Sequence, residues 1–599
     1  MKPLISTRTI SCQSARDPIW VALADTHRLN RAIGHHPLQS EPIWKGAERY
    51  LVKTRLAGLN LEYEEEPFQW SQPEFISITR KFRNGPACRY RMEWQLAEQG
   101  DGSTLVTQQL EIEPRSVWVW LFVLANLWLI SRRLVRETKR ADANIARGAE
   151  AYTDPVQSPV DRLAMARAQE SLAEELNPGE KEVAERLAGL ITSAPDVAVS
   201  RLRPFELADQ WGLDRRQVVS TCLQGVIAGM LDLSWDIICP SCRTVTSRLT
   251  SLSDLEEQVH CHLCDITVRV DFDRAVEATF RPAAGVRTVQ DQSYCIGGPF
   301  RTPHVVAQAV LPAHGTARLQ VPDQEGRYRL FVRGGATVSV EVVPGAATLV
   351  EVAAGETATP AEASLAPGGS LQVRDRLGEQ RHVKLEHLAW ASAATTGHYI
   401  STFGSFRRLF SSEVMRPGLN VNVARVALLF TDLTGSTAMY TRYGDAKAYC
   451  YVQEHFSVLE KAIERHGGAV VKTIGDAVMA AFPDERSAVV AAIELQRAYC
   501  EFARQRDEGE GIELCVGVFA GASYLVNANN ILDYFGQTVN IANRLQGCSQ
   551  GGQIIVPAEL AECGERLGWL TGAKIVGQFE AELKGLSEPL AAVRLAVDI

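Results

Sequence analysis

The pattern of apolar and polar positions divides this 599-residue chain into stretches with different periods. Residues 17–33 have the apolar spacing of a helix. Segments between residues 49 and 114, such as EFISITRKFR and STLVTQQLEIEP, alternate apolar with polar residues, as half-buried antiparallel strands do. The run VWVWLFVLANLWLI at 117–130 then follows, apolar on every side. We therefore predict an α+β domain over residues 1–148 that is closed by a long apolar helix.

The apolar run at 117–130 has two interpretations. It is shorter than the roughly 20 residues that a bilayer span needs, which favours a buried core helix. The alternative is a helix that dips into a membrane surface, anchored by its Trp residues and by the basic segment SRRLVRETKR. Strands followed by one long terminal helix resemble the START-like helix-grip fold. That resemblance implies room for an apolar small-molecule ligand between helix and sheet.

The middle of the chain consists of segments with different composition and periodicity. Residues 149–180 are polar and contain prolines, which predicts a linker with a loose helix. Residues 181–235 predict short amphipathic helices around GLDRR, with Asp214 as an N-cap, and resemble a winged-helix module. Two CxxC pairs follow, so a module over 181–270 is expected to hold a structural Zn²⁺ ion on four thiolates: Cys239, Cys242, Cys261 and Cys264. Two Cys pairs without a metal are the alternative.

Short alternating runs and helical segments complete the chain. Residues 271–395 are rich in Val, Thr, Gly and Pro, with turn residues at short intervals, which predicts a β-sandwich. A helical connector is expected over 396–420. Residues 421–599 alternate strands with helices, and we predict that this last domain carries the chemistry.

Two apolar strands of the last domain each deliver a carboxylate. The strand ARVALLF leads to Asp432, and VVKTIGDAVMAAF places Asp476 at the tip of a hairpin. After Asp432, a tight turn and a helix N-terminus offer backbone N–H groups to phosphate oxygens from five residues: Leu433, Thr434, Gly435, Ser436 and Thr437. Two carboxylates beside a phosphate-binding turn predict a phosphoryl-transfer site that holds two Mg²⁺ or Mn²⁺ ions.

Three motifs occur in the order known from one enzyme family. FTDLTGST, VVKTIGDAVMAAF and DYFGQTVNIANRL resemble the signatures of class III nucleotidyl cyclases. The resemblance implies a ferredoxin-like catalytic domain over 421–599 in which Asp432 and Asp476 bind the metals. Asn540 orients the ribose and Arg544 stabilises the transition state. It also implies a homodimer, in which one subunit gives the aspartates and its partner gives the remaining site residues.

The same resemblance matches Lys472 and Asp533 to the purine-selecting pair. Adenine offers an acceptor at N1 and a donor at N6, which a lysine and an aspartate complement. Guanine reverses both groups and would leave each side chain unpaired, at a cost of about 1–3 kcal/mol. We therefore expect ATP as the substrate and cyclic AMP as the product, with a guanylyl cyclase as the alternative.

Net charge and cysteine content bear on two further questions, whether the protein binds nucleic acid and in which compartment it works. The net charge is −9, and residues 201–265 hold six Arg, no Lys and nine Asp or Glu. A nucleic-acid-binding regulator is therefore the weaker hypothesis, since such a surface should be basic. The start MKPLISTRTI lacks an apolar leader, and the 13 cysteines fit a reducing compartment. We expect a cytoplasmic multi-domain enzyme whose N-terminal domains regulate the cyclase through the connector.

Overall fold

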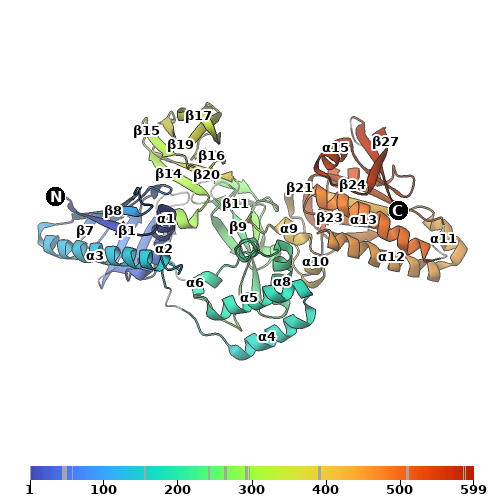
Figure 1. Cartoon of the computed structure of the whole chain (residues 1–599), viewed down its shortest axis with the longest axis horizontal. Helices are drawn as coiled ribbons and strands as arrows, with labels where there is room; N and C mark the ends of the chain where they lie inside the picture. Colours follow the sequence, from blue (N-terminus) through green and yellow to red (C-terminus); the bar gives the residue numbers. More distant parts are fainter. Residues whose placement is uncertain are drawn as a thin grey trace.

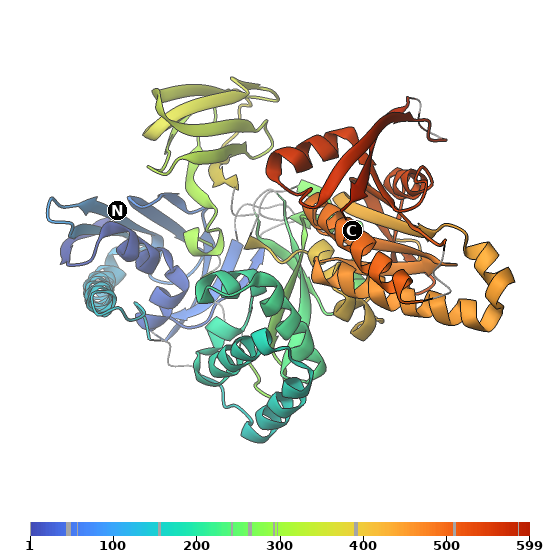
Figure 2. The same cartoon turned by 45° about the vertical axis from the view of Figure 1, so that its right-hand side comes forward.

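The computed structural model describes residues 2–42, 50–56, 58–153, 157–240, 243–261, 266–290, 294–295, 297–388, 393–506, 511–584, 586 and 588–598. Figure 1 shows the N-terminal α+β domain at one end of the molecule and the C-terminal α/β domain at the other. A helical module and a β domain lie between them, as the turned view of Figure 2 also shows. The predicted multi-domain α+β organisation is therefore confirmed.

The N-terminal domain is a curved antiparallel sheet that is crossed by one long helix. Burial alternates at almost every position of β8, as the sequence pattern predicts. The predicted helix over 17–33 is two helices, because Asp25 interrupts it and accepts a 3.0 Å hydrogen bond from the N–H of Arg28. Strand β1 was not predicted. The elements are β1 (Leu4–Cys12), α1 (Arg16–Ala24), α2 (Thr26–Ala32), β2 (Gln39–Pro42), β3 (Tyr50–Leu56), β4 (Leu59–Glu65), β5 (Gln69–Ser71), β6 (Phe75–Phe82), β7 (Ala87–Glu98), β8 (Thr104–Pro114), η1 (Val117–Val119) and α3 (Trp120–Ile145).

Helix α3 differs from the buried core helix that was predicted for 117–130. Val123 and Leu127 pack into the domain core, but only 22% of the most apolar 18-residue stretch is buried. Trp118 and Leu121 are exposed. Val117–Ile145 is long and apolar enough to cross a membrane by length and composition. The prediction of a fully buried helix is wrong, because a run that is apolar on every side contains no period to reveal which face stays uncovered.

The β domain continues the N-terminal sheet, since β14 pairs with β5. Its strands pair in the order β14-β20-β16-β17-β19-β15. A short turn at 312–315 joins β14 to β15, the two ends of this order, so one sheet curls around a common core. The strands thus pair as one continuous sheet, and the predicted β-sandwich stays a prediction. The elements are η4 (Pro299–Arg301), β14 (Val305–Leu311), β15 (Thr316–Gln320), β16 (Gly326–Val332), β17 (Val338–Ala354), β18 (Ala358–Thr359), β19 (Glu362–Asp375) and β20 (Arg381–His387).

The middle module packs helices on a small sheet of order β10-β9-β13. Helix α4 buries Met165 and Leu172 in this core, so the predicted linker over 149–180 is shorter than expected. Asp214 caps α8, as predicted, by accepting a 2.9 Å bond from the N–H of Gln217. The elements are α4 (Arg162–Glu175), η2 (Pro178–Glu180), α5 (Lys181–Ser193), α6 (Asp196–Val199), α7 (Pro204–Trp211), α8 (Arg215–Ile227), β9 (Leu231–Ile238), β10 (Val245–Leu249), η3 (Leu252–Asp254), β11 (Gln258–Cys261), β12 (Ile266–Arg269) and β13 (Val276–Pro282).

The C-terminal domain has a sheet of order β22-β23-β21-β24-β26-β28-β27, and β25 pairs with the end of β24. Helices α12 and α13 bury one face of the sheet, and α14 packs against β24 and β21. The predicted alternation of strands and helices is confirmed. The elements are β21 (Asn420–Leu433), α11 (Ser436–Tyr443), α12 (Asp445–Arg465), β22 (Ala469–Ile474), β23 (Ala477–Phe482), α13 (Glu485–Arg504), β24 (Leu514–Ala528), β25 (Ile531–Phe535), α14 (Gln537–Gln546), β26 (Gln553–Pro557), α15 (Ala558–Leu567), β27 (Ala573–Ala581) and β28 (Leu590–Val597).

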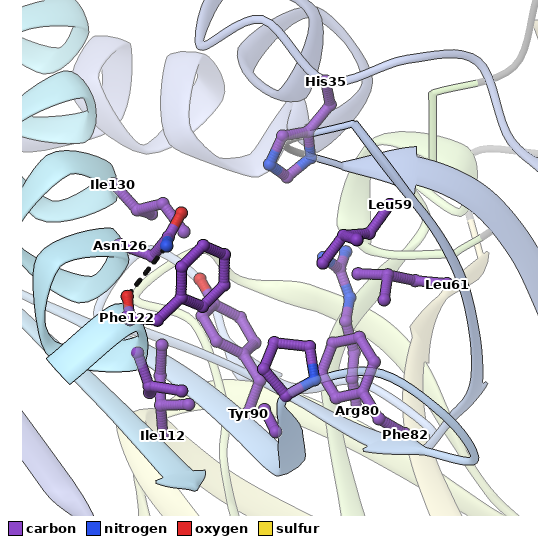
Figure 3. Close-up of a pocket in the computed structure, with 13 residues that line it drawn as sticks. His35, Leu59, Leu61, Arg80, Phe82, Tyr90, Ile112, Phe122, Asn126 and Ile130 are labelled. Carbon is purple, nitrogen blue, oxygen red and sulfur yellow. Dashed lines mark hydrogen bonds between the residues drawn. The ribbon is translucent and has the colours of Figure 1, made fainter. Parts of the chain in front are cut away.

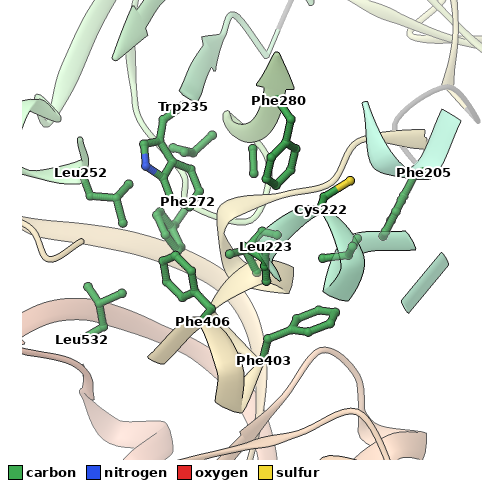
Figure 4. Close-up of a cluster of buried hydrophobic side chains, with 14 of the residues drawn as sticks. Phe205, Cys222, Leu223, Trp235, Leu252, Phe272, Phe280, Phe403, Phe406 and Leu532 are labelled. Atoms are coloured by element: carbon green, nitrogen blue, oxygen red, sulfur yellow. The ribbon is translucent and has the colours of Figure 1, made fainter. Parts of the chain in front are cut away.

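The connector consists of α9 (Gly397–Ser401) and α10 (Gly404–Leu409), and it belongs to a core that two domains share. Figure 4 shows Trp235 and Phe272 of the middle module around Phe406 of the connector, with Leu532 of β25 on the other side. All four side chains are buried. The C-terminal domain is therefore packed onto the middle module through the connector, and the connector is not a free tether.

Candidate active site

Asp432 and Asp476 lie at the same end of two paired strands of the C-terminal sheet, β21 and β23. Asp432 lies near the end of β21, and Asp476 lies in the turn between β22 and β23, where Gly475 takes the positive φ of 65° that favours glycine. The Thr431 hydroxyl accepts a 3.1 Å bond from the N–H of Val478, which ties the two strands together beside the carboxylates. Burial and the charge of Asp476 raise the pKa of Asp432.

The electrostatics of this pair fit a divalent cation. Asp476 Oδ2 is buried and has no hydrogen-bond partner among the described residues. Two carboxylates that repel each other, one with an unsatisfied oxygen, form the donor set that Mg²⁺ or Mn²⁺ prefers. The side chain of Gln546 on α14 hydrogen-bonds Asp432 and lowers its pKa in part. The sequence motifs did not indicate Gln546, although it lies two positions beyond Arg544 on the same helix.

The turn after Asp432 has the geometry that the sequence suggested. Gly435 has a φ of 73° and precedes the first residue of α11. Thr434 is already engaged, since its N–H donates to the Glu513 carbonyl at 2.9 Å and its hydroxyl donates there at 3.2 Å. The first N–H groups of a helix have no acceptor within the helix. The predicted phosphate cradle therefore rests on Gly435, Ser436 and Thr437, and it stays a prediction.

Lys472 and Asp533 meet although 61 positions separate them. Lys472 Nζ lies 2.5 Å from Asp533 Oδ2, in a partly buried ion pair. Asp533 Oδ1 also accepts a 2.8 Å bond from the N–H of Tyr534, which orients the carboxylate. Lys472 thus pairs with Asp533 on β25 and not with Asp476, its near neighbour in sequence. Asp432 with Asp476, and Lys472 with Asp533, form two distinct pairs.

Asn540 and Arg544 lie four residues apart on α14, so they share one face of the helix, as predicted. Asn540 is exposed and Arg544 is half-buried. Gly536, with a φ of 138°, precedes the helix and turns the chain from β25 into α14. The same short segment therefore carries both the purine-side Asp533 and the Asn540–Arg544 pair.

A group of connector residues that the sequence did not single out lies behind Asp533. The Arg407 guanidinium donates to the Leu532 carbonyl and to the Ser401 carbonyl, each at 2.7 Å. The Tyr534 hydroxyl lies 3.0 Å from Ser401 Oγ and 3.3 Å from His398 Nδ1. The residues on both sides of Asp533 are therefore held by α9 and α10.

Helix α8, the second helix of the winged-helix-like pair, faces the C-terminal domain. The Arg216 guanidinium donates to the Gly467 carbonyl at 3.1 Å and lies 4.1 Å from the centre of the Phe403 ring. Arg201 and Arg203 of the same module pair with the buried carboxylate of Glu277. These three arginines make contacts within the protein, and the preference for protein over nucleic-acid partners stays a prediction.

Cys239 follows β9, and Cys261 is the last residue of β11. Cys239 and Cys261 are buried in one cluster with Phe331. Cys242 and Cys264 lie outside the described residues. Among the residues that are described, no group of three or more His, Cys, Asp or Glu is placed to hold a metal ion. The structural Zn²⁺ ion therefore stays a prediction.

An apolar pocket lies between α3 and the N-terminal sheet, where the START-like resemblance implies a ligand. Figure 3 shows Phe122 and Ile130 of α3 facing Leu61, Phe82 and other side chains of the sheet. Arg80 and Tyr90 are among the few polar residues of its lining. The helix-grip resemblance and the apolar ligand both stay predictions.

Comparison with known proteins assigns a family to the C-terminal domain. Residues 420–590 match the family described as Adenylate and Guanylate cyclase catalytic domain. Residues 420–590 are a class III cyclase catalytic domain. Residues 165–294, which include most of the middle module, match a family described as being of unknown function (DUF5939).

The cyclase domain also accounts for the similarity to individual proteins. Adenylate cyclase 2 of Rhizobium meliloti is 29% identical over 179 residues, 28% of this chain and 48% of that protein. The adenylate cyclase of Anabaena cylindrica is 29% identical over 171 residues, 25% of this chain and 34% of that protein. The match thus spans less than half of either relative. A solved structure of adenylate cyclases from Trypanosoma brucei in their monomeric state is 27% identical and covers 29% of this chain and 89% of that chain, with a TM-score of 0.24.

Proposed function

We propose that the chain is an adenylyl cyclase that converts ATP into 3′,5′-cyclic AMP and pyrophosphate at sites shared by two copies of the chain. The observation that carries this proposal is the coexistence, in one cyclase domain, of two distinct pairs. One is an acidic pair with an unsatisfied oxygen, Asp432 and Asp476. The other is the ion pair of Lys472 with Asp533, whose groups complement adenine.

Each residue has one chemical task in this proposal. Asp432 and Asp476 would hold two Mg²⁺ or Mn²⁺ ions, which when bound would lower the pKa of the ribose 3′-hydroxyl and offset charge on the pyrophosphate. Asn540 orients the ribose so that its 3′-oxygen faces the α-phosphorus. Arg544 stabilises the negative charge that grows on the phosphoryl oxygens. No side chain of the protein forms a covalent bond to the nucleotide.

Exposed apolar side chains around the purine pair support a homodimer. Ile531 and Phe535 flank Asp533 on β25, and Ile474 follows Lys472 on β22. Their exposures are 48%, 69% and 54%. Apolar groups gathered beside charged substrate-binding groups are typical of a surface that a partner covers. In this proposal the partner's acidic pair faces this surface and completes the site.

Exchange of the purine pair tests the choice of ATP. Lys472→Glu with Asp533→Lys keeps the ion pair but presents an acceptor to guanine N1–H and a donor to guanine O6. Each of the two mismatches with adenine costs about 1–3 kcal/mol, so we expect kcat/KM for ATP to fall by at least about thirtyfold relative to that for GTP. Product identification with Mg²⁺ or Mn²⁺ and each nucleotide measures this. A wild-type protein that makes only cyclic GMP would favour the guanylyl alternative.

The contacts of the connector support the proposed regulation by the N-terminal domains. Helices α9 and α10 join the core of the middle module and hold both neighbours of Asp533. A movement of that module therefore reaches the purine pair through Arg407 and Tyr534. The pocket beneath α3 supports an apolar ligand as one signal for such a movement.

The variant Tyr534→Phe tests the proposed coupling between the connector and the purine pair. It removes the hydroxyl that contacts Ser401 and His398 and keeps the ring. We expect KM for ATP to rise by up to about thirtyfold, since the two lost hydrogen bonds are worth about 1 kcal/mol each, with the apparent metal affinity unchanged. Tyr499→Phe is the matched control, because the Tyr499 hydroxyl is equally buried, 2.9 Å from the Tyr451 hydroxyl in the other core. Equal effects of the two variants on KM would contradict the coupling.

A further inference from the structure

Helix α3 carries an exposed apolar face that the fold leaves uncovered. Leu121 of α3 is 72% exposed, and Trp118 of η1, the short helix that leads directly into α3, is 96% exposed; Val117 of η1 and Phe122, Trp128 and Leu129 of α3 are exposed as well. The opposite side packs on the sheet through Val123, Leu127 and Leu134. Contiguous exposed apolar side chains mark an interaction surface, whereas isolated ones do not. Figure 1 shows α3 along the N-terminal domain, at the end of the molecule away from the cyclase domain.

The same face becomes basic toward the end of the helix. With 3.6 residues per turn, Arg132, Arg136 and Lys139 lie on the side that carries Trp118 and Leu121. All three basic residues are exposed. Residues 116–140 contain five basic residues and one acidic residue.

The acidic residue of this segment neutralises only one of the three basic residues of the face, Arg136. Glu137 is buried and pairs with Arg136 at 2.9 Å. Arg132 lies 4.5 Å from the centre of the Trp128 ring, where the apolar and basic halves meet. The uncovered face is therefore apolar and aromatic in one half and cationic in the other.

We propose that this face of α3 binds the surface of an anionic lipid bilayer. The apolar half, with its two Trp residues, enters the boundary between headgroups and acyl chains, and the basic half contacts the anionic headgroups. The helix lies on the membrane and does not span it, because spanning would remove Val123, Leu127 and Leu134 from the domain core. A second copy of the chain fits less well, since it would bring an equally basic face.

The apolar pocket beneath α3 supports a lipid surface as the occupant. Phe122 lines that pocket and is also 43% exposed on the uncovered face. Figure 3 shows Phe122 among the residues that line the pocket, so the pocket lies directly beside a side chain that would enter the bilayer. A bilayer at this face would present apolar molecules to the pocket. This inference is independent of the cyclase activity.

Flotation of the full chain with vesicles tests the proposal. We expect the chain to float with vesicles of phosphatidylcholine and phosphatidylserine, and to float less with phosphatidylcholine alone or at high salt, which screens the basic half. Trp118→Glu with Leu121→Glu should weaken binding at least about tenfold, because both side chains would enter the apolar boundary. Arg132→Gln with Lys139→Gln should remove only the preference for anionic lipid.

The controls separate a membrane surface from the other occupants. Leu349→Glu with Leu567→Glu introduces the same charges at exposed apolar positions of the β and cyclase domains and should leave flotation unchanged. Because all four changed apolar residues are exposed, circular dichroism should show intact folding in both double variants. Absent flotation, or equal flotation of the Trp118–Leu121 variant, would overturn the proposal. So would a change in molecular mass of that variant without vesicles, which would assign the face to a second copy.

Discussion

Asp432→Asn is expected to reduce cyclic nucleotide formation about a thousandfold or more without unfolding the protein. The carboxylate is one of two that face the proposed metal ions, and metal-ion stabilisation is worth several kcal/mol in the transition state. The pKa of Asp432 is raised by burial and by Asp476, so the folded domain disfavours the ionised form. At neutral pH the ionised Asp432 carboxylate therefore does not stabilise the folded domain. The Asn variant, which lacks this charge, should unfold at the same temperature as the wild type or at a higher one.

Thermal unfolding with and without Mn²⁺ separates the loss of metal binding from a loss of fold. An ion that binds only the folded state raises the unfolding temperature of the wild type, and this rise should vanish in Asp432→Asn. Asp445→Asn is the matched control, because Asp445 is an exposed carboxylate at the start of α12 in the same domain. Full activity of the Asp432 variant would show that the metal assignment is wrong.

The positions of the candidate site residues could be inferred from the sequence because these residues occur in short segments of recognisable type. An apolar strand that ends in Asp432 and a hairpin with Asp476 at its tip can be identified from the order of apolar and polar positions alone. In the structure the charge of Asp476 raises the pKa of Asp432, so the two carboxylates influence each other, and their role as metal ligands stays a prediction. The pairing of Lys472 with Asp533 required the family resemblance, since nothing in local spacing connects two residues that far apart.

The parts that the sequence did not reveal depend on which face of an element meets another. Gln546 reaches Asp432 only because α14 packs across β21 and β24. Arg407 belongs to a short connector whose composition does not distinguish a tether from a packed core element. The exposed face of α3 is hidden in a run that is apolar on every side. The pairing of β5 with β14 joins segments of two predicted domains, and no local pattern encodes such a register.

Two inactive variants mixed together test the central claim that each site is shared by two chains. Asp432→Asn removes the acidic half of a site, and Arg544→Ala removes the half that carries Asn540 and the purine pair. In a mixed dimer the intact halves of the two chains meet at one of the two sites. Random pairing of equal amounts should therefore restore about a quarter of the wild-type activity. Phe535→Glu in both chains should prevent this recovery, because it places a charge on the proposed dimer surface.

The mixing experiment is measured as cyclic AMP formed from ATP by each variant alone and by the equimolar mixture. We predict near-background rates for each variant alone and recovery in the mixture to about a quarter of wild type. A mixture that stays as inactive as its two components, while sedimentation shows that mixed dimers form, would mean that one chain contains a whole site and would contradict the account.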